Sequence, residues 1–289
     1  MTRAYTRAVD SIEKSDLVSL LQMALDEDSR FGDVTSEAIF SSDINCHARL
    51  VAREPGIMCG ALAIDVLSDL VESKIKHTAC FRDREEFSAN QVLMEIQGSL
   101  LAVLKIERPL LNMIQYLSGI ASATNAIVKK YPRIKIFDTR KTIPGYRKLA
   151  KYAVQCGGGY NHRLNLSEMA MIKDNHIAMG SVKEAVEKIR KSSNVKIEVE
   201  VDTIGQIQEV LENDADIVLL DNFSLEDIRS AVAVIRKKKP LMPIEVSGGI
   251  TPDKLEAINE IGNLGVSMGY LTHTTRFLDL SLEVESGSR

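Results

Sequence analysis

The feature of this sequence that most restricts its fold is a regular alternation of short apolar segments and helical segments, which begins near Ile134. Each apolar segment has the length of one β-strand. In chain order these segments are IKIFD, MAMIKD, KIEVEV, DIVLLD, PIEVS and LGVSMG. Ser181, Ser224 and Thr251 are typical first residues for helices that lie between them. Repeated strand–helix units predict parallel strands joined by right-handed crossovers.

Polar residues or a glycine stand at the ends of successive predicted strands. They are Lys173, Glu200, Asp221, Ser247 and Gly269, each separated from the next by one strand–helix unit. The carboxyl ends of parallel strands form the ligand-binding edge of both α/β barrels and open doubly wound sheets. We favour the barrel because no G-x-G-x-x-G sequence follows the first strand. About six strands can be counted, so we expect an incomplete barrel.

The segment DTRKTIPGYRKLAKYAVQCGGGYNHR, residues 138–163, concentrates positive charge in a chain whose net charge is −4. We assign Arg147, Lys148 and Lys151 to the solvated face of a helix that follows Pro144. The cations that remain at loops or strand ends are Arg140, Lys141, His162, Arg163 and Lys173. Such a group repels itself unless an anion lies between its members, and arginine pairs well with carboxylates and phosphates. The expected ligand is therefore polyanionic.

Glycines and acids accompany these cations. Three consecutive glycines, Gly157–Gly159, suggest the close approach of another element or of a ligand. The sequence SGG at Ser247–Gly249 precedes a helix, and SMGYLTHT repeats this arrangement one unit later, so the pair predicts a phosphate site. Glu200 and Asp221 either balance the charge of the cations or hold ribose hydroxyls, a magnesium ion or a developing positive charge.

Arg108 is a candidate from the first part of the chain. VLMEIQGSLLAVLKIE is interpreted as strands around a Gly-Ser turn, and Pro109 as part of the first turn of the long helix that follows. The helix dipole disfavours a cation at that position. Either an ion pair with Glu107 or with a remote acid compensates Arg108, or an anionic ligand does.

Composition disfavours several classes of protein. The net charge of −4 and the isoelectric point near 5.8 argue against a general affinity for nucleic acid or for membrane surfaces. The sequence shows neither a signal peptide nor an apolar run long enough to span a bilayer, and we expect a cytoplasmic protein. The four cysteines form no C-x-x-C pair, so the sequence indicates neither a zinc site nor a disulfide framework.

The motifs, taken in order, are similar to those of a known family. The similarity rests on ERPLLNMIQYLSGIASAT, the basic segment quoted above, MIKDNHI, EVEV, LLDNF, SGGI and MGYLTH, with LDEDSRFGDVTS and REPGIMCG near the N-terminus. In this order they closely resemble the quinolinate phosphoribosyltransferases, also called carboxylating nicotinate-nucleotide pyrophosphorylases. The similarity covers nearly the whole chain. The acidic pair and T-G-G loop of type I phosphoribosyltransferases are not matched.

The resemblance implies an α/β protein. Its N-terminal α/β sandwich domain would comprise residues 1–112, completed by the tail from about residue 274 to 289, and would pack on an incomplete TIM-like α/β barrel over residues 113–273. The implied reaction transfers the phosphoribosyl group of 5-phosphoribosyl 1-diphosphate to quinolinate with decarboxylation. It yields nicotinate mononucleotide, diphosphate and CO2 for NAD synthesis. Magnesium and a homodimer with shared active sites are implied as well.

The resemblance also implies roles for particular residues. The implied substrate-binding residues are Arg108 (from the partner subunit), Thr139, Arg140, Lys141, His162, Arg163, Lys173, Glu200, Asp221, Ser247, Gly248, Gly249, Met268, Gly269 and Tyr270. The implied catalytic residues are Lys141, Lys173, Glu200 and Asp221. Glu200 and Asp221 would also hold the metal, directly or indirectly. Tyr160 departs from the family pattern because it stands where an arginine is common; a tyrosine there can still hydrogen-bond to a substrate or stack on its ring.

Three alternatives remain open at this point. A related phosphoribosyltransferase could act on another anionic base, such as nicotinate. A phosphate-binding barrel isomerase or lyase would explain the two glycine loops but would leave the cations between Arg140 and Arg163 unused. A non-catalytic metabolite-binding barrel would have no need of Lys141, Glu200 and Asp221.

Overall fold

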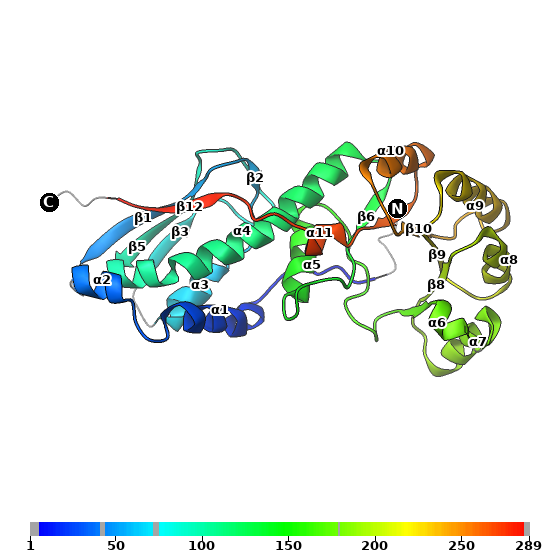
Figure 1. Cartoon of the computed structure of the whole chain (residues 1–289), viewed down its shortest axis with the longest axis horizontal. Coiled ribbons are helices and arrows are strands. Elements are labelled where there is room, and N and C mark those ends of the chain that lie inside the picture. Colours follow the sequence, from blue (N-terminus) through cyan, green and yellow to red (C-terminus); the bar gives the residue numbers. More distant parts are fainter. Residues whose placement is uncertain (1–5, 41–43, 72–74, 179, 286–289) are drawn as a thin grey trace. The chain divides into compact units, whose positions relative to one another are not determined.

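The computed structural model describes residues 6–40, 44–71, 75–178 and 180–285 of the 289-residue chain (Figure 1). The chain divides into two compact units. The barrel unit comprises Ala126–Thr142 and Gly159–His273 together with residues 6–8, and the N-terminal unit comprises Val9–Asn125, Ile143–Gly158 and the residues from Thr274 onward. This division differs from the expected boundary after residue 112. Residues 113–125 and the segment Ile143–Gly158 belong to the N-terminal unit and not to the barrel unit.

The N-terminal unit contains a four-stranded antiparallel sheet in the order β12-β1-β5-β3. These strands are β1 (Asn45–Ala52), β3 (Lys76–Ala79), β5 (Val92–Ser99) and β12 (Leu280–Val284). Alternate residues of β1 such as Ala48 and Leu50 are buried, which is typical of a strand with one face on a core. The last strand, β12, pairs with β1, so the tail of the chain belongs to this sheet. A separate two-stranded pair is formed by β2 (Gly56–Ile57) and β4 (Glu86–Phe87).

Helices cover this unit. They are α1 (Lys14–Ser29), α2 (Val34–Ile39), α3 (Ala63–Leu70), α5 (Arg147–Cys156) and most of α4 (Leu100–Lys130). In α5, Lys148 is exposed and pairs with Asp16 at 2.6 Å, but Lys151 is fully buried, so its assignment to a solvated face is wrong. Among the helices that the structure describes, none combines the length and the apolar character that a membrane crossing requires.

Helix α4 begins earlier than predicted. It starts directly after β5, so the residues after the Gly-Ser pair are helical and do not form a second strand. Pro109 lies inside the helix, where Val103, Ile106 and Leu110 form a continuous buried face with it. Burial of that face compensates for the hydrogen bond that proline cannot donate. Arg108 is therefore an exposed residue in the middle of a helix, and the helix-start argument for an anion beside it is wrong.

The glycines after α5 have a packing reason. A Cβ atom on Gly157 would lie 2.3 Å from the carbonyl oxygen of Ala121 in α4. Only glycine leaves room for the two chain segments at this separation. The expected close approach of another element at these glycines is confirmed.

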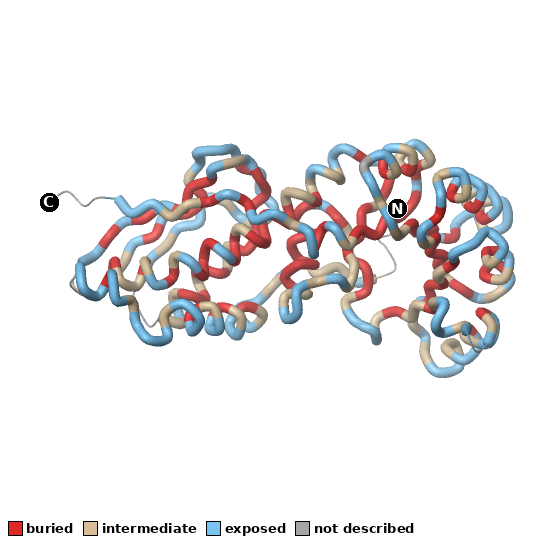
Figure 2. Tube along the Cα trace, in the orientation of Figure 1, coloured by how far each residue is buried: buried red, intermediate tan, exposed pale blue. Residues whose placement is uncertain are grey.

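In the part of the chain that the structure describes, the barrel unit contains six parallel strands in the order β6-β11-β10-β9-β8-β7. They are β6 (Lys135–Phe137), β7 (Ala170–Ile172), β8 (Ile197–Val201), β9 (Ile217–Asp221), β10 (Ile244–Ser247) and β11 (Gly265–Ser267). The strands are buried along most of their length, whereas the helices that follow them expose one side (Figure 2). Within the described residues β6 and β7 end the sheet without pairing to each other, so the barrel is incomplete, as predicted.

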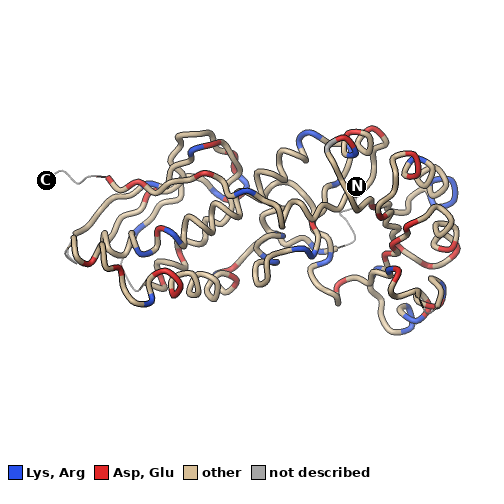
Figure 3. Tube along the Cα trace, in the orientation of Figure 1, with Lys and Arg blue, Asp and Glu red and all other residues tan. Residues whose placement is uncertain are grey.

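The helices of the barrel unit alternate with its strands. They are α6 (Asp174–Ile177), α7 (Val182–Ser192), α8 (Ile204–Glu212), α9 (Leu225–Lys238), α10 (Pro252–Ile261) and α11 (Tyr270–His273). The predicted caps are confirmed, because Ser181, Ser224 and Thr251 each accept a backbone N–H hydrogen bond in the first turn of the helix that follows. Charged residues are spread along the outer helices (Figure 3). The alternation of parallel strands and helices brings the carboxyl ends of the strands together at one edge of the sheet.

Candidate active site

A cavity of about 560 Å³ lies at the carboxyl ends of the barrel strands. Its walls include all the predicted site residues of the barrel unit. The lining residues that sequence reasoning missed are Met171, Leu219, Asn222, Ile250, Ser267 and His273. Three of them carry polar groups and belong to motifs already noted, since Asn222 is part of LLDNF and both Ser267 and His273 are part of SMGYLTHT. Their positions in those motifs were the signal by which all three could have been found.

Arg140 and Arg163 form a basic part of this cavity. Arg163 is 7% exposed, and its Nη1 donates to the carbonyl oxygen of Met169 at 2.8 Å. Burial and the neighbouring charge of Arg140 lower the pKa of Arg163. The Nε of Arg140 is buried and has no protein hydrogen-bond partner. A bound anion would offset the repulsion between the two guanidinium groups and would accept from this Nε.

His162 is held by protein atoms at its backbone and at both ring nitrogens. Its backbone N–H donates to the buried carboxylate of Asp138 at 2.8 Å. Its Nδ1 accepts the backbone N–H of Arg163 at 2.8 Å. Nε2 lies 3.0 Å from Glu198 and 3.4 Å from Glu245, both fully buried. His162 thus holds the backbone of Arg163 in place.

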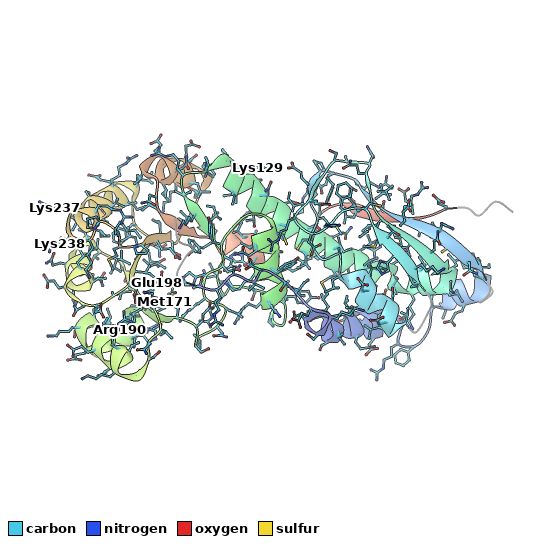
Figure 4. All side chains as sticks on the ribbon, turned by 180° about the vertical axis from the view of Figure 1, so that it is seen from behind. Lys129, Met171, Arg190, Glu198, Lys237 and Lys238 are labelled. Atoms are coloured by element: carbon cyan, nitrogen blue, oxygen red, sulfur yellow. The ribbon has the colours of Figure 1, made fainter. Side chains whose placement is uncertain are left out.

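Side chains on the inner side of the barrel strands differ from those on the outer helices. Figure 4 shows Glu198 and Met171 among the strands, whereas Lys237 and Lys238 lie on the outer side of α9. Residues two apart in a strand share a face, so Glu198 and Glu200 of β8 lie on the same side of the sheet. Glu198 contacts His162, and Glu200 lines the cavity.

Lys173 directly follows β7, and Glu200 and Asp221 belong to the neighbouring strands β8 and β9. The Lys173 ammonium group forms an ion pair with the Glu200 carboxylate. The pKa of Glu200 is raised, chiefly by burial, with Lys173 opposing the rise and Asp221 adding to it. Asp221 accepts a hydrogen bond from the side-chain amide of Asn222 at 2.8 Å. Two carboxylates and one ammonium group thus stand together where hydroxyls, a metal ion or a developing positive charge could bind.

The loop Ser247–Gly249 folds around Asn222. The backbone N–H of Asn222 donates to the carbonyl oxygen of Ser247 at 3.0 Å, and a Cβ on Gly248 would lie 2.2 Å from the Asn222 Oδ1. Gly248 and Gly249 have φ values of 78° and 52°, in the left-handed region that glycine adopts at low cost. The loop leads into α10 and lines the cavity, which is the arrangement expected for a phosphate-binding loop.

A second glycine loop follows β11 and positions Lys141. A Cβ on Gly269 would lie 3.0 Å from Nε2 of His273 and 3.1 Å from Cδ of Lys141. The buried Thr272 hydroxyl donates to the carbonyl oxygen of Lys141 at 2.6 Å. The short helix α11 is therefore hydrogen-bonded to the segment that follows β6, and Lys141 lies beside the second glycine loop.

Two residues discussed in the sequence analysis, Arg108 and Tyr160, are not among the described residues that line the cavity. Arg108 belongs to the N-terminal unit. Tyr160 packs its ring on Phe137, with ring centres 5.5 Å apart, and the ammonium group of Lys135 lies 5.6 Å from the tyrosine ring centre. Tyr160 also extends the edge of β6 through a parallel bridge to Phe137. Among the described side chains that line the cavity, Tyr160 is absent, so the structure gives it a packing function beside β6.

The fold and the cavity define an α/β-barrel protein with a strand-end site suited to polyanions. The family model described as "Quinolinate phosphoribosyl transferase, N-terminal domain" matches residues 33–118, and the model of the C-terminal domain matches residues 120–283. The chain belongs to the quinolinate phosphoribosyltransferase family.

Individual relatives agree with this assignment. The chain is 40% identical over 273 residues to the probable carboxylating nicotinate-nucleotide pyrophosphorylase of Bacillus subtilis, covering 93% of each chain. It is 36% identical over 271 residues to the carboxylating nicotinate-nucleotide pyrophosphorylase of Mycobacterium leprae, covering 91% of this chain and 95% of the relative. The solved structure of the nicotinate-nucleotide pyrophosphorylase from Francisella tularensis superposes with a TM-score of 0.91 at 37% identity, covering 97% of this chain and 100% of that one.

Proposed function

We propose that this chain transfers the phosphoribosyl group of 5-phosphoribosyl 1-diphosphate to quinolinate, releasing diphosphate and CO2 and forming nicotinate mononucleotide for NAD synthesis. The observation that carries the proposal is one cavity that contains Arg140, Arg163 and Lys173 together with Glu200 and Asp221 and two glycine loops. Membership of the family supports the same reaction. Both substrates are polyanions, and fixed cations offset the Coulomb repulsion that opposes bringing them together.

The pyridine substrate would bind at the arginines. Quinolinate carries two neighbouring carboxylates, which Arg140 and Arg163 can each hold through charge-assisted hydrogen bonds. Lys173 adds a third charge at the same cavity, and His162 acts by fixing the backbone of Arg163. Once the ring nitrogen is ribosylated, its positive charge accepts the electron pair that remains at C2 as CO2 leaves. No separate general base is required for that step.

The phosphoribosyl substrate would bind at the acids and the glycine loops. Departure of diphosphate leaves positive charge on the ribose ring, which the carboxylates of Glu200 and Asp221 can stabilise. Their oxygens are also of the type that Mg²⁺ prefers, so these two residues fit a magnesium site, directly or through water. Magnesium would neutralise charge on the diphosphate leaving group. The backbone N–H groups of Ser247–Gly249 and of the Gly269 loop would hold the 5-phosphate.

The proposal gives Arg108 a function in the active site of a second subunit. We infer a homodimer in which Arg108 of the partner subunit completes the quinolinate site, as the family resemblance implies. In support, Arg108 is exposed on α4 and belongs to a different compact unit from the cavity. A cytoplasmic location stays a prediction from the sequence.

The reaction is tested directly. Purified protein is incubated with quinolinate, 5-phosphoribosyl 1-diphosphate and Mg²⁺, and nicotinate mononucleotide is measured by chromatography while CO2 is measured from carboxyl-labelled quinolinate. Both products should appear in equal amounts. Turnover of nicotinate but not of quinolinate would instead support a related phosphoribosyltransferase. Binding of both substrates without either product would support a non-catalytic barrel.

Subunit sharing has its own test. Arg108→Ala and Lys141→Ala proteins should each be nearly inactive. After subunit exchange, one site of each mixed dimer carries both substitutions and the other carries neither. Activity should return to about a quarter of wild type, since roughly half of the dimers are mixed. Verified exchange without any return of activity would show that Arg108 acts within its own subunit.

A further inference from the structure

Two cysteines and an aspartate meet inside the N-terminal unit. A sulfur atom from each of Cys59 and Cys156 and a carboxylate oxygen of Asp83 lie within 4.8 Å of one another. Cys59 is fully buried and Cys156 is 6% exposed, while Asp83 is half-buried and gives the cluster access to solvent. The three residues come from separate segments, because Cys59 follows β2, Asp83 precedes β4 and Cys156 is the last residue of α5. None of them lines the cavity of the barrel unit.

Cys59 and Asp83 are held in place by groups outside the cluster. The backbone N–H of Cys59 donates to the Ser118 hydroxyl of α4 at 3.0 Å. One oxygen of Asp83 accepts the backbone N–H of Ala61 at 3.0 Å, and the other accepts the hydroxyl of Tyr152 at 2.9 Å. Carboxylates that serve as metal ligands are commonly oriented by such hydrogen bonds. The fold therefore fixes the positions of Cys59 and Asp83, whose sulfur and oxygen atoms would bind the ion, before any ion is bound.

The surroundings of the cluster favour a bound cation. The Asp83 carboxylate lies against both sulfur atoms. The C-terminal end of α5, where Cys156 lies, carries the negative end of a helix dipole, which favours a cation. Two thiols packed as ordinary apolar residues would gain nothing from a carboxylate fixed against them.

We propose that Cys59, Asp83 and Cys156 form a binding site for a soft divalent metal ion, with Zn²⁺ as its best match. Thiolate sulfur and carboxylate oxygen are both usual zinc ligands, and three protein ligands leave one position of a tetrahedral ion open. Binding releases the thiol protons to solvent as the two Zn–S bonds form, so affinity rises with pH. Tyr152 is a positioning residue, because it holds the carboxylate and not the ion.

A disulfide between the same cysteines is the competing interpretation. Its formation requires an oxidant to reach the cluster, where the side chain of Cys59 is fully buried. A divalent cation needs no oxidant, and the Asp83 carboxylate attracts it.

The site is tested by metal titration of the full-length, reduced, metal-free protein. Zn²⁺ is titrated against a chromophoric chelator, and Co²⁺ is used as a spectroscopic substitute. We expect about one tightly bound Zn²⁺ per chain, and for Co²⁺ a sulfur-to-metal charge-transfer band together with the intense visible bands of a tetrahedral ion. Zn²⁺ should also raise the thermal midpoint, because it binds the folded chain in preference to the unfolded one.

Variants assign the ligands. Cys59→Ser and Cys156→Ser should each weaken Zn²⁺ binding by more than about 100-fold, the upper limit for loss of an outer hydrogen-bonding group alone. Tyr152→Phe should weaken it by about 10-fold. Cys46→Ser and Cys80→Ser are matched controls and should leave it unchanged, since these cysteines lie outside the cluster.

Three results would overturn the proposal. They are a Co²⁺ spectrum of the wild-type protein without sulfur bands, Zn²⁺ binding lost in Cys80→Ser, and a Cys59–Cys156 disulfide that forms in air while Zn²⁺ fails to bind the reduced protein. The wild-type Co²⁺ spectrum decides the question even where a cysteine variant fails to fold.

Discussion

The cavity of the barrel unit and the Cys59–Asp83–Cys156 cluster of the N-terminal unit were assembled in different ways. The cavity takes one or more polar residues from each of a series of parallel strands, so its members recur at the interval of one strand–helix unit. The cluster takes its members from a loop after β2, a loop before β4 and the end of a helix. A site built on a repeated unit leaves a pattern in the sequence, whereas one built from unrelated segments leaves none.

The largest expected effect comes from replacing one aspartate in each region, Asp221 in the cavity and Asp83 in the cluster, by asparagine. Asp221→Asn should lower turnover by about 100-fold or more while quinolinate affinity stays near that of wild type, since the carboxylate acts on charge that develops in the transition state. Asp83→Asn should lower thermal stability and leave turnover per folded molecule unchanged, because Asp83 bonds to Ala61 and Tyr152. Steady-state kinetics and calorimetry on both variants check this. Equal turnover in Asp221→Asn and wild type would reduce Asp221 to a charge-balancing residue.

The next effect concerns binding. Arg163→Ala should weaken quinolinate binding by about 1.5–3 kcal/mol, which is the range for charge-assisted hydrogen bonds. Arg229→Ala is a suitable control, because Arg229 forms only an exposed pair with Glu260 at 3.4 Å and should change affinity little. Titration calorimetry measures both. If the two variants bind quinolinate equally well, the basic part of the cavity is not the quinolinate site.

Replacing a glycine by alanine should have different effects in the two units. Gly248→Ala should raise the KM for 5-phosphoribosyl 1-diphosphate by about 10-fold, or roughly 1.4 kcal/mol, because the new Cβ meets Asn222 and the positive φ is strained. Gly157→Ala in the N-terminal unit should instead lower the thermal midpoint, because its Cβ meets the backbone of α4. Gly205→Ala on α8 serves as the control, because its new Cβ would lie 4.0 Å from the Thr203 Oγ1 and would meet no atom more closely. A KM change confined to Gly157→Ala would contradict the assignment of the loop.

The smallest effect is a gain in stability. The pKa of Glu200 is raised in the folded chain, so its ionisation destabilises the fold above that raised pKa and has no effect below the unfolded value of about 4.3. Glu200→Gln should therefore raise the thermal midpoint near pH 8 by up to about 2–4 °C, and should not do so near pH 4. Calorimetry at the two pH values checks this. A loss of stability at pH 8 would show that the Lys173 ion pair outweighs the burial of Glu200.

Sequence reasoning failed where it judged a residue from its neighbours in the chain. Arg108 was placed at a helix start because Pro109 is favoured there, but burial of an apolar face carries α4 through the proline. Lys151 was assigned to a solvated helix face together with Arg147 and Lys148, yet its position on α5 is buried. Each error was settled by a contact that local sequence does not contain.

The sequence by itself determined the alternation of strands and helices, the helix caps and the polar strand ends, because these follow from local periodicity and from which side chains satisfy free backbone groups. Those features, with the motifs they carry, were enough to place the cavity residues of the barrel unit and to indicate the family. Only the tertiary structure decided the packing of His162 against Glu198 and Glu245, the fit of Ser247–Gly249 around Asn222 and the meeting of Cys59, Asp83 and Cys156. These depend on distances between segments far apart in the chain, which are set by how whole elements pack and not by the residues that flank them.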